Sequence, residues 1–236
     1  MSQLNLNQVT DAQMADASWK KLYKIGGVAA LMMVVIILIQ FIVFIAWPPP
    51  LEGSAIDWFK LFQESWLVGL LSFELLMIVY AALSILLALA LFIALRRVNQ
   101  PLTAIYLALS IIGVMAFIAA RPAFEMLYLS NQYTAAATDV QRSMFLAAGE
   151  GMLATFHGTT FHVSYILGSI TGLIISVVML RSNIFSKATA YVRIASSICD
   201  FGLYVPTIGI FISMFSVVFL LIWNIMIARR LFQLGR

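Results

Sequence analysis

Both histidines of the chain lie five residues apart, in the stretch 154–169 that reads ATFHGTTFHVSYILGS. An imidazole can bind a metal, carry a proton or donate a hydrogen bond, so this pair is the first place to look for chemistry. On a regular helix His157 and His162 would be about 140° apart, whereas a chelating pair has a spacing of four, as in HExxH zinc sites. A metal would therefore need ligands from other helices, such as Glu74 and Asp200.

No other motif in the sequence indicates an established chemistry. There is no nucleophile elbow, phosphate loop or dinucleotide fingerprint, and the single cysteine, Cys199, excludes an intrachain disulfide and a thiolate metal cluster. A haem clamped by the two histidines is an alternative, but nothing specifies a pocket for the ring. The sequence therefore assigns no metal site, no cofactor and no catalytic residue.

The composition is that of an integral membrane protein. Of the 236 residues, 63% are hydrophobic and 10% are charged, whereas soluble domains carry roughly 25% charged residues. A membrane-spanning helix needs about 20 apolar residues, and this length predicts six spans at 25–47, 74–95, 102–120, 161–180, 188–204 and 207–228. The predicted fold is an all-α, polytopic bundle of six transmembrane helices, a single domain over 20–236 after a mobile cytoplasmic tail over 1–19. The fifth span is short and carries Arg193, whose side chain can snorkel to the interface.

The basic residues predict the orientation of these spans. Eleven of the 14 Lys and Arg residues fall on one side, and only Lys60, Arg121 and Arg142 fall on the other. Cytoplasmic loops hold the excess of positive residues, so both termini are expected to be cytoplasmic in a multi-pass protein of a bacterial plasma membrane. The net charge of +4 is then explained by topology, without a nucleic acid partner. Basic residues flank the spans singly or in pairs, too sparsely for a specific anionic-lipid site.

Two long connections on the opposite side predict short helical cap segments outside the membrane, over 48–65 and 121–156. The first opens with three prolines and continues with a pattern typical of a helix at the interface. In the second, Thr138 and Gln141 fit a capping box that starts a helix near Asp139. We expect this helix to bend or break at its glycines, Gly149, Gly151 and Gly158.

The spans bring ionisable groups to one depth, near the outer boundary of the hydrocarbon. Groups in such positions usually face the bundle interior and pair with one another. We expect a polar pocket for a small ligand or a partner, formed by Glu74, Arg121, Glu125, His157, His162 and Asp200. Arg121 would supply a fixed positive charge, the carboxylates would balance it, and the histidines would respond to pH or bind a metal. The structural alternative is a network that only ties the cap to the bundle.

Small residues recur every four positions down the fourth span, at Thr160, Ser164, Gly168, Gly172 and Ser176. Such a stripe lets another helix approach closely, either within the bundle or from a second copy or a partner membrane protein at Gly168 and Gly172. Two alternatives to the ligand pocket stay open. One is an accessory structural subunit of a larger membrane complex. The other is a metal-dependent membrane hydrolase acting at the outer leaflet, which requires at least three convergent ligands.

Several long strings in the sequence carry a resemblance to a known family. They are ARPAFEMLYLSNQYTAA, FHGTTFHVSYILGSITGLI, IFSKATAYVRI, GLYVPTIGIF and IARRLFQLG. Together they resemble a family of bacterial integral membrane proteins that is catalogued only as a domain of unknown function. The resemblance covers the chain from about Lys20 to its C-terminus and implies a six-span protein of the bacterial plasma membrane. It implies no substrate, cofactor or catalytic residue.

Overall fold

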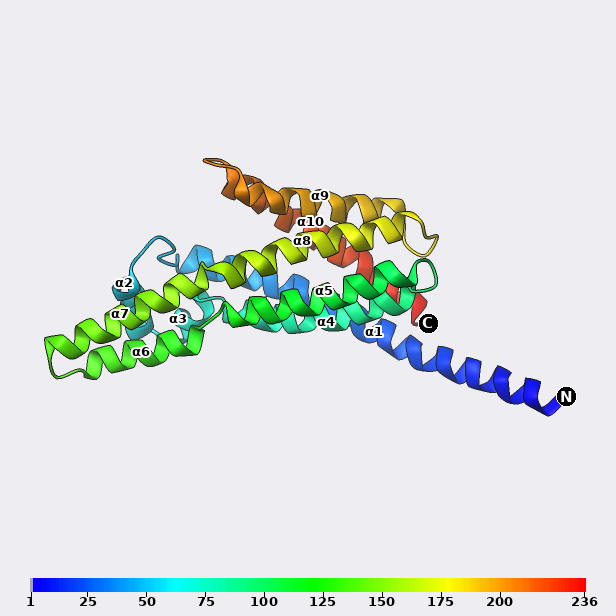
Figure 1. Ribbon diagram of the computed structural model, residues 1–236, viewed down its shortest axis with the longest axis horizontal. Helices are drawn as coiled ribbons and strands as arrows, with labels where there is room; N and C mark the ends of the chain where they lie inside the picture. Colours follow the sequence, from blue (N-terminus) through cyan, green and yellow to red (C-terminus); the bar gives the residue numbers. More distant parts are fainter. Residues whose placement is uncertain (1) are drawn as a thin grey trace. The chain divides into compact units, whose positions relative to one another are not determined.

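The computed structural model describes the backbone of residues 2–236 and the side chains of residues 19–209 and 211–236. Every regular element in this part of the chain is a helix (Figure 1), which confirms the predicted all-α class. In chain order the helices are α1 (Ser2–Ala46), α2 (Ala55–Glu64), α3 (Trp66–Ser72), α4 (Leu75–Leu95), α5 (Gln100–Ala119), α6 (Ala123–Ala135), α7 (Asp139–Phe156), α8 (Thr159–Leu180), α9 (Lys187–Phe201), the 3-10 helix η1 (Gly202–Tyr204) and α10 (Gly209–Leu234).

Five helical segments are long and apolar enough to cross a membrane. They are Trp19–Ala46, Leu75–Leu95, Gln100–Ala135, Asp139–Leu180 and Phe211–Leu234. Each overlaps one of the predicted spans, and the chain is therefore a multi-pass membrane protein. The agreement is expected, because a continuous apolar run of about 20 residues is the strongest local signal in a sequence.

The remaining predicted span, 188–204, forms α9 followed by η1. Its start and end agree with the prediction within one residue. However, α9 has 15 residues, which at a rise of 1.5 Å gives a length of about 22 Å, short of the roughly 30 Å of the hydrocarbon core. It packs along α10 as an antiparallel hairpin (Figure 1). The sixth crossing thus stays a prediction.

The N-terminal segment continues the first span as a helix. We expected residues 1–19 to form a mobile tail, and the structure places residues from Ser2 onward in α1, which runs without interruption to Ala46. The mobility of this segment stays a prediction.

The chain divides into two compact units. One is formed by Met1–Val34, Leu83–Ile111 and Gly168–Arg236, and the other by Val35–Ala82 and Ile112–Leu167. The second unit contains α2, α3, α6 and α7, which pack against one another and which we call the four-helix cluster. It comprises both segments that were predicted as cap segments.

The four-helix cluster has an apolar core of its own. Trp58 packs edge-on against Phe73 with 4.8 Å between ring centroids, and Phe73 lies 4.5 Å from Phe156. Each fully buried side chain of this size contributes about 1.5–3 kcal/mol relative to an exposed one. The core is formed by Ala55, Trp58, Phe59, Phe62, Leu70, Phe73, Ala123, Met126, Leu153 and Phe156. The cluster is therefore a folded element and not a pair of loops.

Hydrogen bonds of side chains mark the start of two helices of the cluster, α7 and α2. The hydroxyl of Thr138 accepts a hydrogen bond from the backbone N–H of Gln141, whose side-chain oxygen accepts one from the N–H of Ala137. This confirms the predicted start of α7 at the Thr138 cap, while the Gln141 side chain bonds to the residue before the cap and not to Thr138 as in a capping box. At the start of α2, hydrogen bonds from the backbone and the hydroxyl of Ser54 hold the pKa of the Asp57 carboxyl below its ordinary value. Both caps satisfy backbone N–H groups that lack partners in the helix.

Gly149 allows α7 to approach α2 closely. A Cβ atom at this position would lie 2.8 Å from Phe59 and 2.9 Å from Ala55, closer than van der Waals contact permits. A Cβ at Gly151, two residues further along the same helix, would meet nothing within 4 Å. The expected break also occurs, since α7 ends at Phe156 and α8 begins at Thr159, on either side of Gly158.

Candidate functional site

Glu74 and Arg121, two of the predicted site residues, form an ion pair. Each lies at a break between helices: Glu74 between α3 and α4, and Arg121 between α5 and α6, directly before Pro122. The Nε–H of Arg121 donates to a carboxylate oxygen of Glu74 at 2.7 Å. The arginine side chain is 3% exposed and that of the glutamate 22%. The prediction that these groups pair is thus confirmed.

Three aromatic rings surround the guanidinium of Arg121. Its central carbon lies 4.2 Å from the ring centroid of Phe117, 4.6 Å from that of Phe156 and 5.4 Å from that of Phe161. A cation held against aromatic faces in this way is stabilised by about 0.5–2 kcal/mol per ring. Phe156 also belongs to the core of the four-helix cluster, so the pair contacts the cluster directly, as the structural alternative requires.

The backbone of Glu74 adopts a left-handed conformation with a φ of 63°. A side chain other than glycine in this region costs about 1–3 kcal/mol, and such strain concentrates at functional sites. Here it allows the chain to turn within two residues from α3 into α4, with the carboxylate of Glu74 against Arg121. The sequence gives no local signal for this turn.

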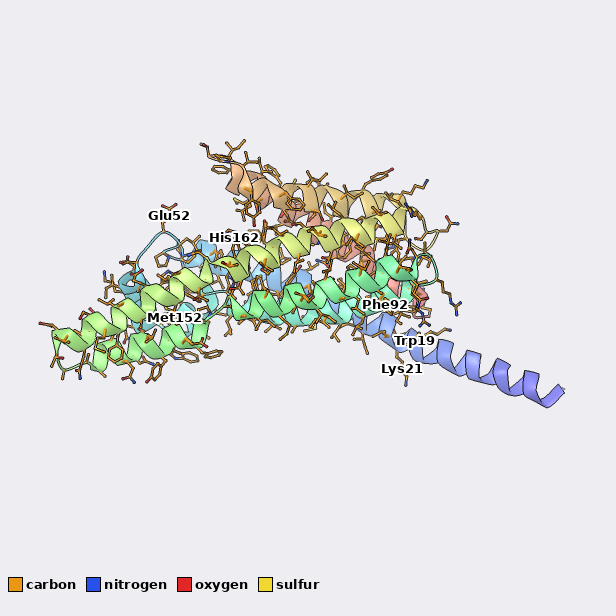
Figure 2. All side chains as sticks on the ribbon, viewed as in Figure 1. Trp19, Lys21, Glu52, Phe92, Met152 and His162 are labelled. Atoms are coloured by element: carbon orange, nitrogen blue, oxygen red, sulfur yellow. The ribbon has the colours of Figure 1, made fainter. Side chains whose placement is uncertain are left out.

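The other predicted residues of the same unit lie at its surface. Glu125 in α6, His157 at the end of α7 and His162 in α8 (Figure 2) are all exposed. The ring of His157 contacts that of Phe156, which in turn contacts Arg121. Neither Glu125 nor His157 forms a hydrogen bond or ion pair with Arg121 in the described structure. Their participation in one site with Glu74 and Arg121 stays a prediction.

Asp200 belongs to the other compact unit, and there its carboxylate lies 4.0 Å from the guanidinium of Arg193. Its place beside Glu74 and Arg121 stays a prediction. Among the described residues, no group of three or more His, Cys, Asp or Glu side chains is placed to hold a metal ion. The hydrolase alternative therefore gains no support, since it requires such a group.

Arg193 forms a second buried polar centre, which was not predicted from the sequence. Its side chain is 12% exposed and donates to the carbonyl oxygen of Gly168 at 3.2 Å and to the hydroxyl of Ser196 at 3.1 Å. The guanidinium also lies over the ring of Trp223, at 5.3 Å. The expectation that Arg193 snorkels to the interface is wrong, because these partners hold it against α8 and α10. The spacing of Arg193, Ser196 and Asp200 along one face of α9 is the signal that could have indicated this centre.

Gly172 makes room for this centre. A Cβ at this position would lie 2.7 Å from the guanidinium carbon of Arg193 and would also meet the hydroxyl of Ser197. The close approach expected along the small-residue stripe is therefore confirmed at Gly172, where the approaching helix is α9. At Gly168 a Cβ would meet nothing within 4 Å, so binding of a partner helix there stays a prediction.

Arg193→Lys is expected to lower the free energy of unfolding by about 1–2 kcal/mol. A lysine keeps the charge, but its single ammonium group cannot replace the planar fork that reaches both Gly168 and Ser196. Thermal unfolding of the detergent-purified protein measures the change, with Arg181→Lys, at an exposed position, as the matched control. Equal stability of the two variants would contradict a buried role for Arg193.

Comparisons with known proteins identify the family of the chain and add no activity. No curated protein and no solved structure matches the chain. The family described as Domain of unknown function (DUF4386) matches residues 25–233. This match covers most of the chain and agrees with the resemblance carried by its long apolar and polar strings. The chain therefore belongs to the DUF4386 family of proteins.

Proposed function

We propose that this chain is a six-span protein of the bacterial plasma membrane, with cytoplasmic termini, that binds a cationic ligand or partner at its extracytoplasmic face. The four-helix cluster forms the binding surface. The first support is length, because the segments Gln100–Ala135 and Asp139–Leu180 have 36 and 42 residues. At 1.5 Å per residue they hold about 54 and 63 Å of helix, roughly twice the thickness of the hydrocarbon core. The helical length that exceeds the thickness of the hydrocarbon core corresponds to α6 and α7.

The second support is the sign of the charge on the cluster. The segments 48–74 and 121–156 contain seven acidic and three basic residues. Lys60 and Arg142 each lie beside an aspartate three residues earlier in the chain. Glu64 and Glu125, in contrast, are exposed and form no ion pair with any described residue. The uncompensated charge at this surface is negative.

The observation that carries the proposal is the burial of Arg121 against Glu74. The sequence predicted that Arg121 supplies a fixed positive charge to the pocket, balanced by the carboxylates. Its guanidinium is neutralised by Glu74 and enclosed by three rings, so it is not available to a ligand. A ligand at this face therefore meets carboxylates and the exposed imidazole of His157. These groups bind cations and hydrogen-bond donors.

A second candidate is an accessory subunit that assembles through the membrane bundle. It is favoured by the open position at Gly168, where a side chain would meet nothing within 4 Å. A helix of a partner protein could pack there without rearrangement.

One experiment separates the two functions. The tagged full-length protein is crosslinked in intact cells with a carbodiimide, which joins carboxylates to amines, and is then purified and examined for bound proteins and small cations. We expect a bound species that falls at least tenfold in the double variant Glu64→Gln with Glu125→Gln. The matched control, Asp11→Asn with Asp16→Asn, removes the same charge near the N-terminus and should retain it.

The variant Gly168→Leu tests the second candidate, assembly through the membrane bundle. If the bound species is lost in Gly168→Leu and kept in the double glutamine variant, assembly through the bundle replaces binding at the four-helix cluster. If the carboxylate variant and its control bind equally, the acidic surface is not the binding surface.

A further inference from the structure

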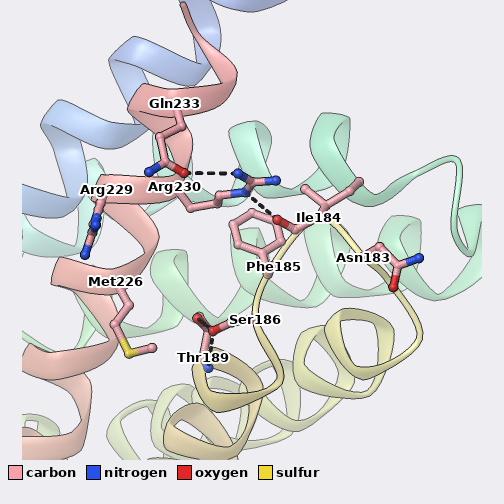
Figure 3. Close-up of a pocket in the computed structure, with 9 residues that line it drawn as sticks. All are labelled: Asn183, Ile184, Phe185, Ser186, Thr189, Met226, Arg229, Arg230 and Gln233. Carbon is pink, nitrogen blue, oxygen red and sulfur yellow. Dashed lines mark hydrogen bonds between the residues drawn. The ribbon is translucent and has the colours of Figure 1, made fainter.

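A pocket of about 450 Å³ lies in the unit that contains α9 and α10 (Figure 3). Its walls are the connection from α8 to α9, the first turn of α9 and the last turns of α10. One part of the lining is apolar and comes from Ile184, Phe185 and Met226. The pocket is open to its surroundings, and none of its lining residues is among those assigned to ligand binding above.

Two arginines line the pocket, and no carboxylate does. The Nε–H of Arg230 donates to the carbonyl oxygen of Ile184, and its Nη1–H donates to Gln233 at 3.0 Å (Figure 3). These bonds hold the guanidinium of Arg230 at the wall. Arg229 is exposed and forms no hydrogen bond or ion pair with any described residue. The pocket thus presents one fixed and one unengaged cation.

The position of these arginines along α10 matches the depth of lipid phosphates. The apolar part of α10, from Gly209 to Ala228, has 20 residues, which is about 30 Å of helix and equals the thickness of the hydrocarbon core. Arg229 and Arg230 follow directly, so a crossing formed by this apolar part brings them to the level of the headgroups. One turn earlier in α10, the side chain of Met226 also lines the pocket, where it can contact the glycerol and upper acyl region of a lipid.

We propose that this pocket binds a phosphate group, and that an anionic membrane phospholipid supplies it. A guanidinium binds phosphate through two parallel hydrogen bonds and is always charged, which makes a pair of arginines the preferred ligands of this group. Basic pockets between transmembrane helices bind lipid headgroups in the same way. From the sequence, the basic residues were predicted to be too sparse for a specific anionic-lipid site. The fold places this pair of arginines beside the connection that contains Ile184 and Phe185, which forms one wall of the pocket.

The test is a titration of the detergent-purified full-length protein, followed by native mass spectrometry. The probes are phosphatidylglycerol, phosphatidylcholine and inorganic phosphate. Arg229→Gln removes the unengaged cation without breaking a hydrogen bond or an ion pair with a described residue, so the variant should unfold at the same temperature as the parent. The matched control, Arg181→Gln, removes one exposed positive charge that does not line the pocket.

We expect phosphatidylglycerol to bind at least tenfold more tightly than phosphatidylcholine. We also expect Arg229→Gln to weaken its binding about tenfold, and Arg181→Gln to change it less than twofold. Equal weakening by both variants would overturn the proposal, because diffuse attraction to positive charge would then explain the binding. Equal affinity for the two lipids would overturn it as well. Binding of inorganic phosphate alone, lost in Arg229→Gln, would keep the phosphate site and overturn the lipid as its source.

Discussion

Arg121→Met is expected to lower the free energy of unfolding by about 3 kcal/mol, which corresponds to a fall in Tm of about 6–12 °C. The substitution leaves the carboxylate of Glu74 without its counter-charge and removes the cation that three aromatic rings enclose. Because the side chain of Glu74 is 22% exposed, water solvates it in part, and the loss falls at the lower end of the range for buried pairs. Thermal unfolding in detergent measures it.

The double variant with Glu74→Gln shows whether the loss comes from the pair. Glu74→Gln alone leaves a buried guanidinium without a counter-charge, so it also destabilises. If the two groups act together, the double variant loses at least 1 kcal/mol less than the sum of the two single losses. Additive losses would contradict an energetic coupling between Arg121 and Glu74.

Gly149→Leu is expected to lower the free energy of unfolding by about 3 kcal/mol, at the upper end of the range for overpacking. The first carbon of the new side chain would already overlap Phe59 and Ala55 of α2. Relief requires α7 to move away from α2, which opens the core of the four-helix cluster. Thermal unfolding and the rate of limited proteolysis between α6 and α7 both report the change.

Gly151→Leu is the matched control for this prediction, since it adds the same side chain to the same helix where nothing lies within 4 Å. It should leave stability unchanged or raise it by about 0.5–1 kcal/mol, because glycine disfavours helix. Similar losses in both variants would mean that the helix itself, and not its contact with α2, sets the cost.

Signals confined to short stretches of sequence predicted much of the fold. Apolar runs located five of the spans, Thr138 and Gln141 located the start of α7, and Gly158 located the break before α8. Each of these features depends on neighbouring residues alone. The pattern of α2 was recognisable for the same reason. The helix α3 was not anticipated, because it is a short α-helix of seven residues within an apolar stretch.

Features that depend on residues far apart in the chain were not predictable. The rings around Arg121 come from three helices, and the turn at Glu74 requires a backbone conformation that glutamate rarely adopts. The buried orientation of the Arg193 side chain depends on the carbonyl oxygen of Gly168. The pocket beside Arg229 depends on the connection from α8 to α9, which lies against α10. Burial and charge neutralisation decide what a site can bind, and both depend on the tertiary structure.

The measurement that tests the account most directly is the accessibility of single cysteines to a membrane-impermeant maleimide in intact spheroplasts. In a Cys199→Ala background, Met144→Cys places a thiol in α7 at a position that is 66% exposed, and Lys187→Cys places one at the start of α9. We predict immediate labelling of Met144→Cys, and labelling of Lys187→Cys only after the membrane is permeabilised. The reverse pattern would place the four-helix cluster in the cytoplasm and contradict a binding surface at the extracytoplasmic face.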